Sequence, residues 1–293
     1  MELDKEEILE VVKRALREDV GHGDVTTRHV VPAGARARGA FRAKSSGVIA
    51  GLPVARQVFE ILDPEVTFQE SLREGESVGP GQIVAVVEGR ASSILTGERV
   101  ALNFLQRLSG IATKTAKFVE SVRYYHARIT DTRKTTPGLR ALEKYAVRVG
   151  GGYNHRFGLF DAVLIKDNHI AVAGGVKQAI MAVRRGAPHT MKIEVEVETF
   201  EQIDEALEVK ADIIMLDNMT VEQMKEAVER INGRAVVEAS GGVTEENVVD
   251  IAKTGVDYIS VGALTHSSTA LDISLDLDLV PSEAEEGQSS ASE

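Results

Sequence analysis

The chain has 293 residues, of which 43% are hydrophobic and 27% are charged, the composition of a folded protein with one large domain or two smaller ones. Its 45 acidic and 34 basic residues give a formal net charge of -11, which argues against a nucleic-acid coat protein or a binder of anionic membranes. The absence of cysteine excludes disulfides, thiolate metal sites and thiol nucleophiles, and it fits a cytoplasmic location. We expect no membrane segment, because no apolar run approaches the roughly 20 residues that span a bilayer. The acidic start MELDKEEILE also lacks the order of a signal peptide.

The first third of the chain predicts helices packed on a small sheet. Apolar residues recur at helical spacing over residues 3–17. Between residues 35 and 89, short runs alternate apolar and polar side chains between glycine and proline turns. This pattern predicts an antiparallel sheet with a helix at 52–62 on one face. A long helical pattern follows over residues 92–125, and we expect an interruption at the Ser-Gly pair 109–110.

After residue 125, short β-branched strands alternate with helices, an order that is typical of a parallel sheet covered by helices. Two of the helices begin with capping boxes, at Thr199 with Gln202 and at Thr220 with Gln223. An open doubly wound sheet and an incomplete barrel both fit this pattern, and we prefer the barrel because polar residues follow nearly every strand. The six expected strands are residues 126–134, 161–166, 192–197, 212–216, 235–239 and 257–262.

Positively charged residues gather where the first two of these strands end. Arg133 and Lys134 end the first strand, Lys166 ends the second, and His155 with Arg156 follows the glycine run between them. In so acidic a chain, this group predicts an anionic ligand, because the arginine fork suits a carboxylate and lysine suits a carboxylate or a phosphate. A single cation at a strand end is usually only solvated, and His155 alone fits a turn as well as a binding site. The prediction therefore depends on the five residues together.

Acidic residues after the third and fourth strands predict an opposite wall. Carboxylates of Glu196 and Asp217 can accept hydrogen bonds from sugar hydroxyls or hold Mg²⁺ through water, although Asp217 could instead only cap a turn. Glu194, Glu196 and Glu198 share one face of their strand, so at least one of them needs a partner if that face is buried.

Glycine-rich loops after the last two strands, at residues 239–243 and 260–267, suggest a phosphate site. Glycine lets backbone N–H groups approach a ligand, and the loops after the final barrel strands usually cradle phosphate. Alternatively, Gly241 and Gly242 serve only a tight turn. His266 either donates to the same phosphate or simply packs.

Two other functions remain open from the residues alone. Lys166 could be a Schiff-base lysine in an aldolase-type barrel, or the chain could be a phosphosugar-binding or regulatory barrel without turnover. The turns contain no Walker or dinucleotide fingerprint, so ATP hydrolysis and hydride transfer rank low among the possible functions.

Taken together, the motifs of the second half resemble those of the quinolinate phosphoribosyltransferases, also called nicotinate-nucleotide pyrophosphorylases (carboxylating). The resemblance runs in order from about residue 19 (EDVGHGDVTT) to about residue 277, and the helix motif LTGERVALNFLQRLSGIAT strengthens it. The seven motifs are DTRKTTPGLR, GGGYNHR, LIKDNHI, IEVEVE, IIMLDN, EASGGV and ISVGALTHS.

This resemblance implies a transferase of de novo NAD biosynthesis. The phosphoribosyl group would pass from phosphoribosyl pyrophosphate to quinolinate, and decarboxylation would give nicotinate mononucleotide, pyrophosphate and carbon dioxide, with Mg²⁺. A related phosphoribosyltransferase with a different acceptor is the alternative. The resemblance also implies a homodimer or larger assembly in which Arg99 reaches the active site of the neighbouring subunit.

The resemblance further assigns roles to single residues. The residues implied to hold the quinolinate carboxylates are Arg133, His155, Arg156 and Lys166, with Arg99 from the neighbour. Lys134 would face the pyrophosphate, and Glu196 and Asp217 would face the ribose hydroxyls and the metal. The residues implied to hold the phosphates are Ser240, Gly241, Gly242, Gly262 and His266. The residues expected to be catalytic are Lys134, Lys166, Glu196 and Asp217.

The family's fold is α/β, with an α+β amino-terminal sandwich domain and an incomplete, TIM-like α/β barrel. It implies a first domain at residues 1–108, completed by 268–280, and a barrel domain at 109–267. The acidic, serine-rich stretch 281–293 cannot bury enough apolar surface to offset its ordering entropy, so we expect a disordered tail there.

Overall fold

The computed structural model describes residues 3–280, so the tail expected at 281–293 lies outside the described residues. The described chain groups into two units. The first unit consists of residues 3–113, 137–150 and 268–280, and the second consists of residues 114–136 and 151–267.

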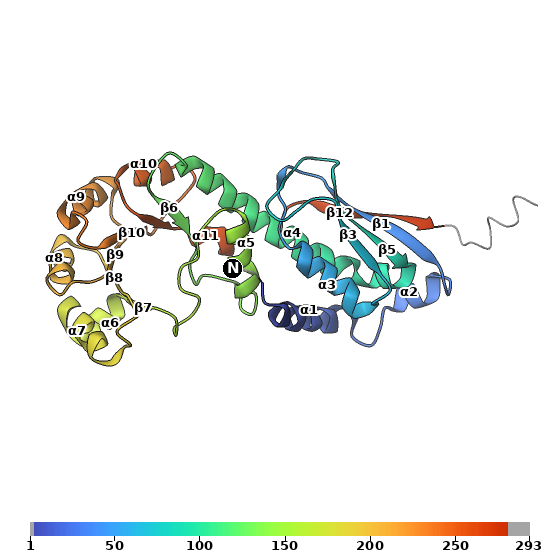
Figure 1. Cartoon of the computed structure of the whole chain (residues 1–293), viewed down its shortest axis with the longest axis horizontal. Helices are drawn as coiled ribbons and strands as arrows, with labels where there is room; N and C mark the ends of the chain where they lie inside the picture. Colours follow the sequence, from blue (N-terminus) through green and yellow to red (C-terminus); the bar gives the residue numbers. More distant parts are fainter. Residues whose placement is uncertain (1–2, 281–293) are drawn as a thin grey trace, which may run out of the picture. The chain divides into compact units, whose positions relative to one another are not determined.

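The first unit contains the predicted antiparallel sheet, which takes one edge strand from the far end of the chain (Figure 1). That strand, β12, pairs with β1 from Arg36 opposite Val280 to Ala43 opposite Ile273. Residues beyond the second unit therefore complete this sheet. Across the sheet the strands are β12 (Ile273–Val280), β1 (Arg36–Ala43), β5 (Ile83–Arg90) and β3 (Thr67–Glu70), and a separate pair is β2 (Gly47–Val48) with β4 (Ser77–Val78).

Helix α3 covers one face of this sheet, as its sequence predicts. Phe59 of α3 contacts Phe41 of β1 and Phe68 of β3, with ring centroids 6.1 and 6.0 Å apart. Burial of these rings, together with aliphatic residues of α3, forms the core of the unit. The helices that begin in this unit are α1 (Lys5–Val20), α2 (Val25–Val30), α3 (Leu52–Leu62), α4 (Ala91–Val122) and α5 (Arg140–Val149).

The expected interruption of the long helix at Ser109 and Gly110 is wrong, because α4 runs unbroken through both residues. Ser109 is buried, and its hydroxyl bonds to the backbone N–H and C=O of Ala50. A Cβ on Gly110 would lie 2.0 Å from the carbonyl oxygen of Thr269. Both residues therefore permit close packing against distant backbone and do not break the helix.

Helix α5 also departs from the expected domain division, which placed residues 109–267 together. Residues 137–150 group with the first unit. Glu143 is buried and accepts hydrogen bonds from Arg107 of α4, and the Tyr145 hydroxyl donates to Glu74 over 2.8 Å. These bonds attach α5 to the first unit, although α5 follows β6, a strand of the second unit, in the sequence.

The second unit contains one parallel sheet of six strands, in the order β6-β11-β10-β9-β8-β7. From β7 to β11, each new strand pairs beside the preceding one and always on the same side. A doubly wound sheet would instead reverse direction at one point in the strand order. The observed order confirms the barrel and excludes the doubly wound alternative. The barrel is incomplete because β6 and β7 do not pair, and a single bridge joins Thr130 of β6 to Tyr153. The strands are β6 (Arg128–Thr130), β7 (Val163–Ile165), β8 (Ile193–Val197), β9 (Ile213–Asp217), β10 (Val236–Ser240) and β11 (Tyr258–Ser260).

Helices cover the outer side of these strands (Figure 1). Both predicted capping boxes are confirmed, since Thr199 and Thr220 each exchange hydrogen bonds with the glutamine three residues later. Among residues 3–280, no helix is long and apolar enough to cross a membrane. The helices are α6 (Asp167–Ala173), α7 (Val176–Gly186), α8 (Phe200–Glu208), α9 (Val221–Ile231), α10 (Val248–Lys253) and α11 (Ala263–His266).

The alternation of side chains along the strands determines what the inside of the sheet contains. Val195, Leu216 and Ala239 are fully buried, the environment expected beneath the covering helices. Their neighbours in sequence lie on the other face, where Glu196, Asp217 and Ser240 line a common cavity. Polar side chains at the carboxyl ends of several strands are thereby brought to one opening.

Candidate active site

A cavity of about 540 Å³ opens at the carboxyl ends of the parallel strands, within the second unit. It contains all of the residues that the sequence predicted for the site except Arg99, Gly262 and His266. The predicted residues that line it are Arg133, Lys134, His155, Arg156, Lys166, Glu196, Asp217, Ser240, Gly241 and Gly242.

Gly262 and His266 lie beside the cavity. A Cβ on Gly262 would be 3.0 Å from Cδ of Lys134 and 3.3 Å from the ring of His266, so these three residues are neighbours. Arg99 is exposed on α4 in the first unit and does not line this cavity. The structure therefore groups the predicted residues of the second unit, and Arg99 belongs to the first unit.

Arg133 and Arg156 make one side of the cavity strongly positive. The Nε atoms of both are buried and have no hydrogen-bond partner among the described residues. Arg156 is fixed by one bond from its guanidinium to the carbonyl of Ala162, over 3.2 Å. Burial, and then the nearby charge of Arg133, lower the pKa of Arg156. Two desolvated cations with unused donors are suited to an anionic ligand.

The opposite wall is acidic. Lys166 Nζ lies 2.7 Å from Glu196 Oε2. Burial raises the pKa of Asp217, and the negative charges of Glu196 and Glu198 raise it further. The side-chain amide of Asn218 donates to Asp217 over 2.8 Å. This wall offers oxygen acceptors and an unfavourable concentration of negative charge, which hydroxyl donors or a hard cation would relieve.

The loop after β10 approaches the cavity through its backbone. Gly241 has φ +91°, and a Cβ there would lie 2.1 Å from Oδ1 of Asn218. Gly242 has φ +60° with open space around it. The turn therefore requires glycine for conformation and for packing, and the same small residues leave the loop accessible to a ligand.

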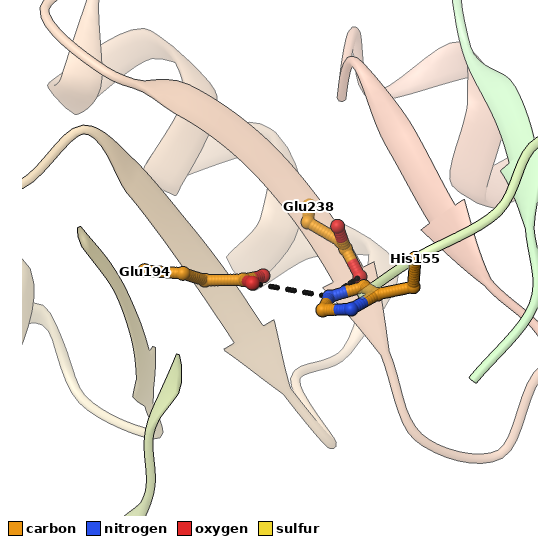
Figure 2. A group of neighbouring side chains, drawn as sticks. All are labelled: His155, Glu194 and Glu238. Atoms are coloured by element: carbon orange, nitrogen blue, oxygen red, sulfur yellow. Dashed lines mark ion pairs between the residues drawn. The ribbon is translucent and has the colours of Figure 1, made fainter. Parts of the chain in front are cut away.

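Sequence reasoning missed two buried acidic residues next to His155, Glu194 and Glu238 (Figure 2). His155 Nε2 lies 3.0 Å from Glu194 Oε2 and 3.6 Å from Glu238 Oε1. The Ser260 hydroxyl donates to Glu238, and burial followed by the charge of Glu194 raises the pKa of Glu238 to about 7. The alternation in β8 already required a partner for one buried glutamate, and Glu194 is that residue. No local signal in the sequence singled out Glu238.

The chain was then compared with known proteins. Two family models match it, the quinolinate phosphoribosyl transferase N-terminal domain over residues 24–109 and the C-terminal domain over residues 111–276. A probable nicotinate-nucleotide pyrophosphorylase (carboxylating) of Synechocystis sp. is 48% identical over 267 residues, which cover 89% of this chain and 90% of that protein. The corresponding enzyme of Mycobacterium leprae is 48% identical over 276 residues, covering 92% and 96%.

Solved structures agree with these relatives. The crystal structure of NadC from Streptococcus pyogenes superposes with a TM-score of 0.92 at 45% sequence identity, covering 96% of this chain and all of that one. The nicotinate-nucleotide pyrophosphorylase of Ehrlichia chaffeensis gives a TM-score of 0.90 at 39% identity. On the matched domains and on relatives of this identity, the chain belongs to the quinolinate phosphoribosyl transferase family.

Proposed function

We propose that this protein transfers the phosphoribosyl group of phosphoribosyl pyrophosphate to quinolinate and decarboxylates the product, giving nicotinate mononucleotide, pyrophosphate and carbon dioxide. The observation that carries the proposal is a cavity with two buried arginine Nε atoms, without hydrogen-bond partners in residues 3–280, on one side and the carboxylates of Glu196 and Asp217 on the other. A planar dicarboxylate suits the first side, and a polyhydroxylated sugar suits the second. Family membership and the names of the relatives support the same reaction.

The charges of the cavity support one proposed position for each substrate. Arg133, Arg156 and Lys166 would hold the carboxylates of quinolinate. Glu196 and Asp217 would accept hydrogen bonds from the ribose hydroxyls. Lys134 would bind the pyrophosphate, and the residues placed to bind phosphate are Ser240, Gly241, Gly242, Gly262 and His266.

Positioning by these residues accounts for the first chemical step. The cations hold the ring nitrogen of quinolinate toward the anomeric carbon, where an N–C bond forms as the C–O bond to pyrophosphate breaks. Positive charge develops on the sugar in this step, and the carboxylates of Glu196 and Asp217 stabilise it. The pyrophosphate leaves toward Lys134.

Decarboxylation follows on the same cations. The carboxylate next to the newly quaternary nitrogen leaves as carbon dioxide. The electron pair of the broken C–C bond remains on the ring carbon, which then takes up a proton. Arg133, Arg156 and Lys166 must keep hold of the remaining carboxylate while releasing the departing one.

Magnesium fits the acidic wall. Glu196 and Asp217 present oxygen donors, and burial together with the nearby charge of Glu196 raises the pKa of Asp217, so a divalent cation held through water would relieve their repulsion. Mg²⁺ bound with phosphoribosyl pyrophosphate would neutralise charge on the leaving pyrophosphate. We also propose a cytoplasmic homodimer or larger assembly in which Arg99 contributes to the quinolinate site of a second copy, since Arg99 is exposed on α4.

The Schiff-base alternative is less consistent with the geometry. The Nζ atom of Lys166 lies 2.7 Å from Glu196 Oε2 in an ion pair, whereas a Schiff-base lysine needs an amine that is available to attack a carbonyl. Borohydride trapping with a keto substrate should therefore leave Lys166 unmodified.

A direct assay tests the proposed function. Purified protein should convert quinolinate, phosphoribosyl pyrophosphate and Mg²⁺ to nicotinate mononucleotide, measured by chromatography, with carbon dioxide released in equal amount. Nicotinate in place of quinolinate is the control for an altered acceptor. Product from nicotinate alone would indicate a related phosphoribosyltransferase, and binding of phosphoribosyl pyrophosphate without any product would indicate a phosphosugar-binding barrel.

A further inference from the structure

The backbone N–H of His155 and both nitrogens of its ring lie close to polar groups of other residues. Its backbone N–H donates to the buried carboxylate of Asp131 over 2.9 Å. Its Nδ1 accepts a hydrogen bond from the backbone N–H of Arg156 over 2.7 Å, and its Nε2 faces Glu194 and Glu238 (Figure 2). The ring therefore links the buried carboxyl pair to the main chain of a residue that lines the cavity.

These contacts determine the proton of the ring. Nδ1 accepts from the N–H of Arg156, so it carries no proton of its own. Nε2 then carries the proton and lies 3.0 Å from Glu194 Oε2. His155 is accordingly neutral, and it contributes orientation to the cavity where the sequence alone suggested a positive charge.

The carboxyl pair below the ring must itself hold a proton. The side chains of Glu194 and Glu238 are only 5% and 6% exposed, and oxygen atoms of the two lie within 4.8 Å of each other. Two buried carboxylates this close do not both ionise beside a neutral imidazole. The proton belongs to Glu238, because burial and the charges of Glu194 and Asp131 raise its pKa more than the hydrogen bond from the Ser260 hydroxyl lowers it.

A metal ion is a poorer occupant of the same three residues. Their donor atoms lie close enough together for one ion. A metal would need the lone pair of Nε2, however, and this would move the ring proton to Nδ1, where it would face the N–H of Arg156.

We propose that Glu194 and Glu238 are positioning residues for the acceptor substrate: facing Nε2 of His155, they hold the ring in its Nε2–H form and so fix the main chain of Arg156 beside the bound dicarboxylate. The inference rests on the proposed function for the identity of that dicarboxylate. Because Glu238 is neutral, Glu194 and Glu238 together place only one negative charge near the site proposed to bind an anion.

The consequence is a dependence of quinolinate binding on the charge of Glu238. When Glu238 loses its proton, the negative charge beside His155 increases and repels the dicarboxylate bound at the neighbouring Arg156. The groups that act on Glu238 are Glu194, His155, Asp131 and Ser260. The KM for quinolinate should therefore rise above about pH 7 by about tenfold, while the KM for phosphoribosyl pyrophosphate changes by less than about twofold.

Substitutions of Glu238 separate a neutral hydrogen-bonding role from a charged one. Glu238→Gln replaces a protonated carboxyl by a neutral amide of the same shape, so at pH 6 its KM for quinolinate should stay within about twofold of wild type and should not rise at alkaline pH. Glu238→Ala removes the carboxyl that Ser260 and His155 face, and it should raise the KM for quinolinate about tenfold at every pH. Glu229→Gln, on the exposed face of α9, is the matched control and should behave as wild type.

The tautomer can be measured without any turnover. In a ¹H–¹⁵N correlation spectrum of the imidazoles, the signal that disappears in His155→Asn should show a protonated Nε2 and an unprotonated Nδ1 from pH 6 to 8. Thermal unfolding of each variant verifies that it folds. A protonated Nδ1 would overturn the proposal, as would a Glu238→Gln enzyme as defective as Glu238→Ala at pH 6. If wild type makes no nicotinate mononucleotide, the proposed function fails. The tautomer measurement still decides whether His155 is held by Glu194, Glu238 and Arg156 as proposed.

Discussion

Arg133 and Arg156 are charged neighbours whose buried Nε atoms have no hydrogen-bond partner among the described residues. Such a pair is unfavourable for the free protein, because desolvation and repulsion act on both guanidinium groups. A bound dicarboxylate reverses both effects by supplying acceptors and opposite charge. The charges and hydrogen-bond donors of Arg133 and Arg156 therefore favour the dicarboxylate that the cavity is proposed to bind.

Replacing Arg133 with alanine should weaken quinolinate use selectively. The loss of a charge-assisted hydrogen bond in a partly buried site costs about 1.5–3 kcal/mol, so kcat/KM for quinolinate should fall roughly 10- to 150-fold. Arg185→Ala, at an exposed position of α7, is the matched control and should leave kcat/KM unchanged. Steady-state kinetics with each substrate varied in turn measures the effect, and equal activities of the two variants would contradict the role of Arg133.

The raised pKa of Glu238 also predicts how stability changes with pH. The carboxyl loses its proton near pH 4.5 in the unfolded chain and near pH 7 in the folded protein, so the folded state binds more protons between these values. The free energy of unfolding should therefore decrease as pH rises from about 4.5 to 7, relative to Glu238→Gln, which cannot titrate there. Urea unfolding of both proteins across this range tests the sign. A difference that grows with pH in favour of wild type would show that Glu238 is ionised when folded.

At the scale of elements, α4 shows that a helix can contain serine and glycine for reasons of packing. Ser109 and Gly110 bring the helix against the backbone of residues 50 and 269, which are distant in sequence. Glycine in a helix interior costs about 1 kcal/mol relative to alanine. The close approach to Thr269 explains why alanine cannot take its place.

Gly110→Ala should accordingly destabilise the protein. The added Cβ would lie 2.0 Å from a backbone oxygen, so the helix or residues 268–271 must shift, at a cost of about 1–3 kcal/mol. Gly186→Ala is the control, because that position ends α7 and has nothing within 4 Å of the added atom. It should be neutral or stabilise by up to about 1 kcal/mol. Urea unfolding followed by circular dichroism compares the two, and equal midpoints would show that the backbone near Thr269 yields easily.

At the scale of the whole molecule, the cavity is lined entirely by residues of the second unit, whereas Arg99 belongs to the first. The resemblance to the family assigns Arg99 to the site of a neighbouring subunit. A shared site of this kind can be tested by mixing two defective chains, because each can supply what the other lacks.

Arg99→Ala and Arg133→Ala should each be nearly inactive alone and should recover activity when co-assembled. Each mixed dimer has one intact site out of two, so a preparation that contains only mixed dimers should have about half of the wild-type activity. Co-expression with two affinity tags and assay of the doubly purified species provides the measurement. Absence of recovery in a species that contains both chains would place Arg99 in the site of its own chain or outside the site altogether.

Much of this architecture could be predicted from local sequence patterns. Each strand of the parallel sheet and the capping boxes at Thr199 and Thr220 followed from periodicity and short-range hydrogen bonding, which depend on residues a few positions apart. Because the carboxyl ends of parallel strands share one rim, the motifs after the strands also predicted which side chains would line the cavity. The family resemblance added the role of each residue to its location.

Contacts between distant residues required the tertiary structure. The packing of Gly110 on Thr269, the attachment of α5 through Glu143, and the grouping of His155 with Glu238 join segments that no local pattern relates. Such contacts depend on where strands and helices pack, and the protonation of His155 depends in turn on these contacts. The sequence by itself therefore determined the elements and the chemistry of the rim, whereas burial and long-range hydrogen bonds decided which of those groups are charged and how they are held.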